Sequence, residues 1–216
     1  MNEWLVVGSS PSVIETFPFA LAEHKGACTI TANAGILIFK EYNRWPNYMV
    51  MIDQRASEMF RFHVRLAQVE GTRLVTSNWA SKAIEEAKLT ADVVLNVPEE
   101  REYKFYRDRY TDPLLSGLLS CQFAIQGGAK RLVLIGMDGY HDWNWEPKVE
   151  TFDGRLGDCN GREKTRVVVA PFMQSMLDAC PDVEFVQYGK PRYQLTGDNF
   201  TLMDPAVKHG ELELTR

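Results

Sequence analysis

The chain opens with residues 1–17, MNEWLVVGSSPSVIETF, and this stretch decides the fold. The apolar run Leu5–Val7 breaks into a turn of small residues, Gly8–Ser12, and a helix-period pattern follows. A buried strand that turns directly into a helix is the first half of a βαβ unit. Ser12 is followed three residues later by Glu15, which is the signature of a capping box. We therefore expect a strand, a tight turn, and a helix that begins at Ser12.

The same alternation of apolar runs and helix-period segments continues along the chain. The expected strands are Trp4–Val7, Thr29–Ala32, Tyr48–Ile52, Arg73–Thr76, Val93–Leu95, Leu132–Ile135 and Val183–Val186. The expected helices are Ser12–His24, Ala56–Val69, Ser81–Lys88, Gly117–Gly127 and Thr165–Ala179. Most of the strands are continuous apolar runs, as in sheets that are covered on both faces. The pattern predicts an α/β, Rossmann-like fold with a mainly parallel sheet and helices on both faces, formed as one domain over residues 1–216.

Two long connections interrupt this alternation. Residues 139–166 are rich in Trp, Gly, Asp and Asn and are long for a loop inside a compact domain, so we interpret them as a lid or binding loop. The tract Arg101–Tyr110 interleaves cations with aromatic side chains. Such a tract can stack on nucleotides or single strands, but a solvated helix with an aromatic core face is the preferred interpretation.

Composition limits the classes of function. The formal net charge of −5 argues against a broad nucleic-acid-binding surface, although it does not exclude a nucleic acid as a local partner. The four cysteines form no C-x-x-C pair, which favours free thiols in a reducing cytoplasm. The first expected strand leaves no room for a signal peptide, and no apolar run is long enough to span a bilayer. We expect a cytoplasmic protein, and a homo-oligomer stays open.

Polar and small residues follow several of the expected strands. In an open α/β sheet, ligands bind beyond the carboxyl ends of the strands. Asn33 follows the second strand, Asp53 the third, and Gly136-Met137-Asp138 follow the strand Leu132–Ile135. The turn Gly8–Ser12 can present backbone N–H groups and hydroxyls to an anion at a helix N-terminus. These groups predict a binding site at one edge of the sheet.

Each of these residues also has a purely structural interpretation. The turn Gly8–Ser12 lacks the lysine of a P-loop and is equally compatible with an ordinary bend. Asp53 and Asp138 are candidates for ribose, base or metal binding, or for helix caps. His141 suits general-base chemistry, or is a solvated loop residue. Asp138, His141, Asp142 and Asp153 have no recognised metal-ligand spacing, so we assign no metal site.

Two motifs together resemble a known family. Val6-Val7-Gly8-Ser9-Ser10-Pro11-Ser12 and the segment from Ser116-Gly117 to Gly136-Met137-Asp138-Gly139-Tyr140 are similar to motifs of bacterial lipooligosaccharide sialyltransferases. The likeness covers residues 4–55 and 114–141. Archaeal proteins of the 6-hydroxymethylpterin diphosphokinase-like kind share a similar first turn and sheet, and related chains occur in viruses of bacteria.

The resemblance implies roles for residues at matching positions. Gly8, Ser9, Ser10, Pro11 and Ser12 would line the nucleotide phosphate and ribose, and Asn33 and Asp53 would contact the nucleotide. Ser116 and Gly117 would lie at the donor sugar and phosphate, and Gly136, Met137 and Asp138 would bracket the base and ribose. Tyr140 would hydrogen-bond the leaving phosphate. Such enzymes need no metal for catalysis.

The chain also departs from this family. The asparagine of the family's first turn is Ser9 here, and the lid histidine is absent from residues 158–166. His141, or else Asp142 or Asp153, would then be the base. The cations Arg155, Arg162 and Lys164, with Arg166, are suited to binding a diphosphate, a sugar carboxylate or an acceptor phosphate.

Three functions remain open at this point. The first is a glycosyltransferase that moves a sugar from a CMP- or UDP-activated donor to an unknown hydroxyl acceptor. The second is an ATP-dependent diphosphokinase of a pterin-like alcohol, with Mg²⁺ held by Asp53 and Asp138. The third is a nucleotide-binding protein without catalysis.

Overall fold

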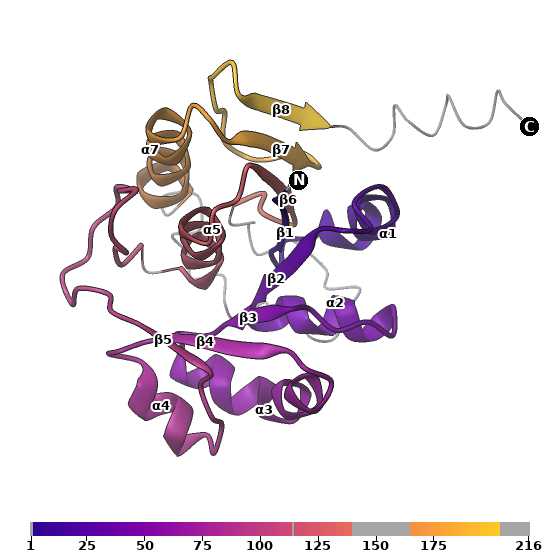
Figure 1. Cartoon of the computed structure of the whole chain (residues 1–216), viewed down its shortest axis with the longest axis vertical. Coiled ribbons are helices and arrows are strands. Elements are labelled where there is room, and N and C mark those ends of the chain that lie inside the picture. The colour runs from indigo at the N-terminus through magenta and orange to yellow at the C-terminus, as the bar shows by residue number, and fades with distance from the viewer. Residues whose placement is uncertain (1, 114, 140–164, 204–216) are drawn as a thin grey trace, which may run out of the picture.

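The computed structural model describes residues 2–113, 115–139 and 165–203. Its centre is an eight-stranded sheet in which every neighbouring pair of strands is parallel (Figure 1). The strands are β1 (Glu3–Val7), β2 (Cys28–Ala32), β3 (Tyr48–Val50), β4 (Arg73–Ser77), β5 (Val93–Leu95), β6 (Arg131–Ile135), β7 (Glu184–Tyr188) and β8 (Phe200–Met203). The α/β, Rossmann-like fold predicted from the sequence is confirmed.

Helices cover both faces of the sheet. On one face lie α1 (Val13–Glu23), α2 (Ile36–Glu41), α3 (Gln54–Val69) and α4 (Ser81–Glu86). On the other face lie α5 (Ser116–Gln126) and α7 (Ala170–Ala179). In Figure 1, α5 and α7 lie on one side of the sheet, and α1 and α2 lie on the other. Two short helical turns complete the elements, a 3₁₀ turn at Asn33–Gly35 and a π turn at Thr165–Val169.

Alternation along the central strands builds two separate cores. In β1, Trp4 and Val6 face α5 and α7, whereas Leu5 and Val7 face α1 and its neighbours. Successive side chains of a strand point to opposite faces of the sheet, so a strand with apolar residues at every position is buried on both sides. This is why continuous apolar runs, rather than alternating ones, mark the strands of this sequence.

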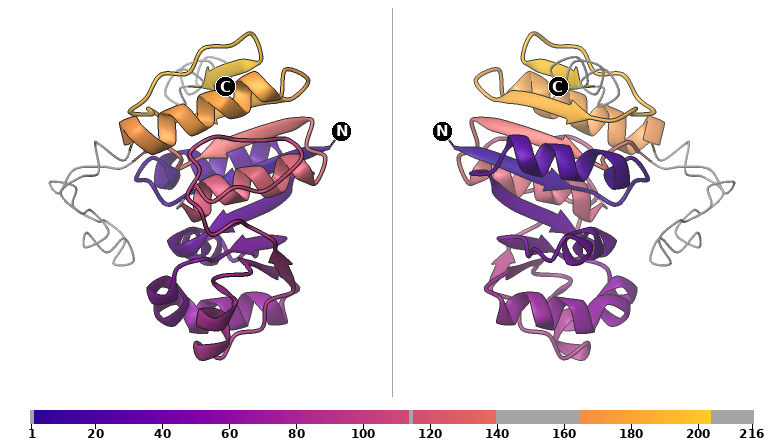
Figure 2. Two further views of the ribbon diagram at one scale, coloured as in Figure 1. Left: turned by 90° about the vertical axis from the view of Figure 1, so that its left-hand side faces the viewer. Right: turned by 90° about the vertical axis from the view of Figure 1, so that its right-hand side faces the viewer.

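The order of the strands places the switch point of the sheet beside β1. The order is β5-β4-β3-β2-β1-β6-β7-β8, so the chain runs outward from β1 to β5 and then returns to β6 on the other side of β1. Figure 2 shows the two wings of the sheet, with α3 and α4 at the β5 end and α7 at the β8 end. In such sheets the carboxyl ends of the two strands at the switch point open a crevice.

Two elements of the structure, α2 and β8, were not predicted from the sequence. Helix α2 is a run of four consecutive apolar residues, Ile36–Phe39, that are all buried, so it has no amphipathic period. Strand β8 is an edge strand whose Thr201 and Leu202 are exposed, so it lacks the apolar signal of the central strands. Both elements form because their neighbours supply the contacts.

The capping box expected at the start of α1 is not formed. Ser12 has helical backbone angles, and its hydroxyl caps no N–H group of the helix. The first N–H groups of the helix are instead bonded to backbone carbonyls of the turn, with Val13 N donating to Ser10 O at 3.0 Å and Ile14 N to Pro11 O at 3.2 Å. The hydroxyl of Ser12 is therefore not needed for the helix.

The helix expected for Arg101–Tyr110 is also wrong. The segment is an irregular loop, with only an isolated bridge between Arg101 and Asp112. The buried Phe105 anchors it through its N–H, which donates to Ser175 Oγ at 2.9 Å. Thr111 exchanges hydrogen bonds with the buried amide of Gln122 on α5. Tertiary anchors of this kind override local helix preference.

Among the described residues, no helix is both long enough and apolar enough to cross a bilayer.

Candidate functional site

The carboxyl ends of β1 and β6 are joined by close backbone contact. Gly8 N donates to Ile135 O at 2.8 Å and Ser10 N donates to Gly136 O at 3.0 Å. A Cβ at Gly8 would overlap the carbonyl oxygen of Gly136, and Gly136 itself has a left-handed φ of 62°. Glycine is needed at both positions, because any side chain would separate the two turns. The two sequence motifs therefore meet at the switch point of the sheet.

The start of α5 reaches the same place from the other face. A Cβ built on Gly8 or on Gly117 would lie 2.8 Å or 3.2 Å, respectively, from the sulfur of Met137. Met137 thus packs between the first turn and the N-terminus of α5. Helices α1 and α5 both begin at this edge, so the positive ends of two helix dipoles lie near the crevice. This arrangement favours an anion such as a diphosphate.

Asn33 lies at the end of the neighbouring strand β2 in an unusual conformation. Its φ is 46°, which is left-handed and rare for a residue with a side chain. Its Oδ1 atom is buried and accepts no hydrogen bond from the protein residues that the structure describes. Buried polar atoms are normally satisfied, so this oxygen is a candidate to accept a hydrogen bond from a ligand.

Ser12 and Asp138 converge beside Gly189, which follows β7. A Cβ on Gly189 would lie 2.9 Å from Ser12 Oγ and 3.2 Å from Asp138 Oδ1, and Gly189 has a φ of 106°. The Asp138 residue is 1% exposed. The hydroxyl oxygen of Ser12 is buried, and no described protein atom hydrogen-bonds to it. The turns before α1 and after β6 and β7 thus bring a hydroxyl and a carboxylate together at the switch point.

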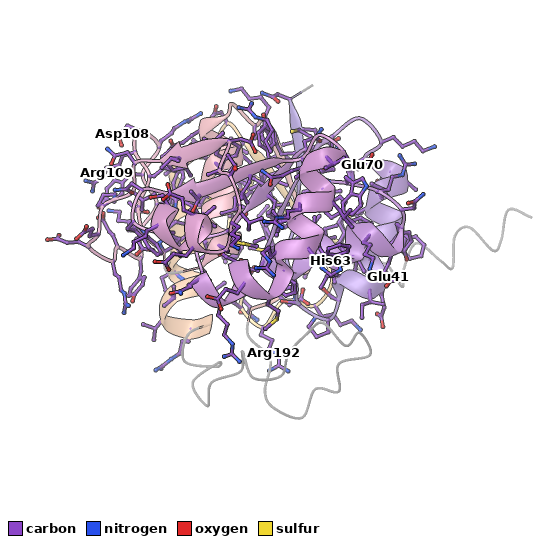
Figure 3. All side chains as sticks on the ribbon, turned by 90° about the horizontal axis from the view of Figure 1, so that it is seen from below. Glu41, His63, Glu70, Asp108, Arg109 and Arg192 are labelled. Atoms are coloured by element: carbon purple, nitrogen blue, oxygen red, sulfur yellow. The ribbon has the colours of Figure 1, made fainter. Side chains whose placement is uncertain are left out.

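The segment after β7 contributes residues that the sequence analysis did not assign to the site. The hydroxyl of Tyr193 donates to Met137 O at 2.6 Å, and Gln187 Nε2 donates to the same carbonyl at 3.3 Å. Burial, with the nearby charge of Asp138 as a lesser cause, raises the pKa of Tyr193 far above its usual value. Arg192 N donates to Asp138 O at 2.8 Å, and its side chain projects from the carboxyl edge (Figure 3). This segment follows the predicted strand Val183–Val186, so the rule that ligands bind beyond strand ends also points to it.

Asp53 follows β3, two strands away from β1, and caps a helix. It is exposed at the end of β3, and its Oδ1 accepts the N–H of Ala56 at 3.1 Å as the N-cap of α3. Its backbone carbonyl also accepts the N–H of Ser57 at 2.9 Å. The helix-cap interpretation, one of the two left open, accounts for the whole observed geometry of this residue.

The remaining first-turn residues lie at the rim. Ser9, Ser10 and Pro11 are partly exposed, and Ser10 Oγ donates to Gly139 O at 3.2 Å. The buried Ser116 begins α5 and its carbonyl accepts the hydroxyl of Ser120. The other candidates, Tyr140, His141, Asp142, Asp153, Arg155, Arg162 and Lys164, lie outside the described residues, as does most of the loop 139–166. Within the described ranges, no three His, Cys, Asp or Glu side chains gather as a metal site.

Comparisons with known proteins support the fold. The structure is similar to that of the MAf glycosyltransferase from Magnetospirillum magneticum AMB-1, with a TM-score of 0.53 and 14% sequence identity. The match covers 99% of this chain and 37% of that one, so this chain spans little more than a third of the neighbour's length. No family model and no curated protein matches the sequence.

Proposed function

We propose that this protein is a glycosyltransferase that binds a nucleotide-activated sugar at the β1/β6 switch point. The observation that carries the proposal is the meeting of Gly8–Ser12, Gly117 and Gly136–Asp138 at that point. Ligands of doubly wound sheets bind at this position. The shared fold with a glycosyltransferase is consistent with it.

In this proposal the first turn and the start of α5 hold the diphosphate or phosphate of the donor. The dipoles of α1 and α5 stabilise negative charge as the phosphate departs. Ser12 Oγ, Asn33 Oδ1 and the Asp138 carboxylate hydrogen-bond the ribose and base. Carboxylates at the ends of such strands commonly bind ribose hydroxyls.

The groups that act on the acceptor belong to residues 140–164 in this proposal. His141, or else Asp142 or Asp153, removes the proton of the acceptor hydroxyl, and Tyr140 hydrogen-bonds the leaving phosphate. Arg155, Arg162 and Lys164 bind the acidic groups of donor or acceptor. The sialyltransferase family and the CMP or UDP donor are the finer form of the same proposal.

The diphosphokinase alternative is less well supported by the geometry. It would hold one Mg²⁺ between Asp53 and Asp138. These residues end β3 and β6, which are three strand steps apart in the sheet, or about 14 Å at the usual spacing. Ligands of Mg²⁺ lie at about 2 Å from the ion, so the two carboxylates are poorly placed to share it.

Ligand preference tests the proposal. Thermal unfolding and titration calorimetry would be measured with CMP, UDP and ATP, each with and without Mg²⁺. We expect CMP or UDP to raise the Tm by a few degrees without metal, because a ligand that binds only the folded chain stabilises it. Stabilisation by ATP with Mg²⁺ alone would favour the diphosphokinase. Tight nucleotide binding with no transfer from any sugar donor would favour a binding protein.

The Ser12→Ala variant localises the site. It removes a hydroxyl that makes no hydrogen bond within the described protein, so the Tm without nucleotide stays nearly unchanged. Nucleotide affinity falls about 5- to 10-fold, the loss of one ligand hydrogen bond. Ser81→Ala is the matched control on α4, where the hydroxyl bonds only to Asn78 O. Equal nucleotide affinities in both variants would place the nucleotide elsewhere.

A further inference from the structure

Helix α3 carries a row of exposed apolar side chains on its outer surface. Met59, Phe62, Leu66 and Val69 are all exposed, with Phe62 at 65% and Val69 at 83% of their full accessibility. Their spacing of three, four and three residues is the a/d pattern of helices that pack against another helix. The buried residues of α3, such as Phe60 and Val64, fall on a different side of the helix. We call the four exposed residues the α3 seam.

This row is unusual for a solvent-exposed helix. Single apolar side chains on a surface need no explanation, but a contiguous row along one helix marks an interaction surface. The rest of the exposed face is charged, with Glu58, Arg61 and Arg65 beside the seam. A helix that only covered the sheet would carry polar residues at these four positions.

We propose that the α3 seam joins two copies of this chain, with the two α3 helices packed side by side in parallel about a two-fold axis. This inference does not depend on the proposed function. Charge complementarity between two α3 helices identifies the partner as a second copy of this chain. In a parallel helix pair, a residue next to an a position faces the residue five positions later on the partner helix.

The charges along α3 suit this pairing. Arg65 of one copy would face Glu70 of the other, and Glu58 would face His63 together with Lys40, whose Nζ lies 3.4 Å from His63 Nε2. Within its own chain Arg65 Nη2 already donates to Lys88 O at 2.7 Å, which leaves its other N–H groups for Glu70. Each pair would occur twice because the interface is two-fold. His63 and Glu70 lie along the same side of the helix (Figure 3). Each pair places a cation opposite a carboxylate, Arg65 in one case and Lys40 beside His63 in the other.

The opposite orientation lacks this complementarity. An antiparallel pair that matches Phe62 with Leu66 and Met59 with Val69 is centred on residue 64. It would bring Arg65 close to Arg65 of the other copy. Like charges that meet across an interface weaken it. The sequence of the helix therefore favours the parallel arrangement.

The arrangement has a consequence for the candidate site. Helix α3 begins at the carboxyl edge, after β3, and returns to the start of β4 at the opposite edge. In Figure 3, Glu70 at the end of α3 and Arg192 at the carboxyl edge lie toward opposite ends of the molecule. Two parallel α3 helices thus turn the carboxyl edges of both sheets toward the same side.

The mass in solution is the first test. Sedimentation velocity of the full chain over about 1–100 µM should show a monomer that converts to a dimer, and Phe62→Ser should shift the dissociation constant upward at least 10-fold. Leu202→Ser, on the exposed edge strand β8, is the matched control and should leave the dimer unchanged. A chain that is monomeric throughout, or a dimer that Phe62→Ser leaves intact, overturns the proposal.

Cysteine cross-linking tests the orientation. In the parallel dimer, Met59 of one copy meets Met59 of the other, so Met59→Cys alone should form a covalent dimer on mild oxidation, above the background of the unmodified chain. An antiparallel dimer would cross-link only when Met59→Cys and Val69→Cys chains are mixed. That second outcome overturns the parallel arrangement. Neither test uses a nucleotide, so failure here leaves the proposed function unaffected, and the reverse holds as well.

Discussion

The carboxyl ends of β3 and β6 look alike in sequence and differ in the folded chain. Each apolar strand runs into an aspartate, Asp53 in one case and Asp138 in the other. Asp53 is exposed and caps α3, whereas Asp138 is 1% exposed and lies beside Ser12 and Gly189 at the switch point. The same residue type in the same local pattern therefore caps a helix in one place and is buried at the switch point in the other.

The difference comes from the neighbouring strands. Beside β6 lies β1, whose following turn contains Gly8 and can approach the backbone of Gly136. Beside β3 lie β2 and β4, and the chain passes directly from β3 into α3. A carboxylate at the start of a helix then finds free N–H groups immediately and is used as a cap.

The largest expected effect comes from closing the approach of the two turns. Gly8→Ala places a Cβ against the carbonyl of Gly136, so we expect a loss of about 1–3 kcal/mol in the free energy of unfolding, the usual range for overpacking. Nucleotide binding should be lost with it. Urea unfolding measures the first quantity and titration calorimetry the second.

Gly26→Ala is the matched control for this variant. No atom lies within 4 Å of a Cβ at Gly26, so its stability and nucleotide affinity should be close to those of the unmodified chain. If Gly8→Ala behaved like Gly26→Ala, the switch point would not be a tightly built site.

The difference between Asp53 and Asp138 is tested by replacing each aspartate with asparagine. Asp138→Asn should weaken nucleotide binding at least 10-fold, because a charge-assisted hydrogen bond to the ribose is lost. Asp53→Asn should leave affinity within about 2-fold, because asparagine is an equally good N-cap. Asp53→Ala should lower stability by about 1 kcal/mol through loss of the cap, again without weakening affinity. If Asp138→Asn and Asp53→Asn changed nucleotide affinity equally, the carboxyl ends of β6 and β3 would not differ in their part in nucleotide binding.

The smallest expected effect is a pH dependence of stability that comes from His63 on α3, the helix that follows β3. Burial, and secondly the charge of Lys40, lower the pKa of His63 on α3 below 6.5. The unfolded chain then binds this proton more readily than the folded chain, so stability is lost as pH falls below about 6.5. His63→Gln should reduce the fall in Tm between pH 7.5 and 5.5 by about 1–2 °C, since solvent screens a partly exposed group. Both chains would carry Phe62→Ser so that association does not contribute, and an identical fall in both would contradict the shift.

Several features of the fold could be predicted because they depend on local pattern. The runs around Leu5–Val7 and Leu132–Ile135 are apolar at every position, which is typical of a strand buried on both faces. The tract Arg101–Tyr110 was misjudged because its conformation depends on distant anchors, Ser175 on α7 and Gln122 on α5. Gly189 and Tyr193 were missed because their place beside Asp138 and Met137 depends on the pairing of β7 with β6, which the local pattern does not show.

By itself, the sequence determined the alternation of strands and helices and the small-residue turn Gly8–Ser12, since both follow from side-chain size and periodicity. Only the tertiary structure decided which polar residues meet. Strand order is set by packing over the whole domain, and it puts β6 beside β1 while leaving β3 two places away from β1. That order brings Asp138 beside Ser12 at the switch point and leaves Asp53 as the cap of α3.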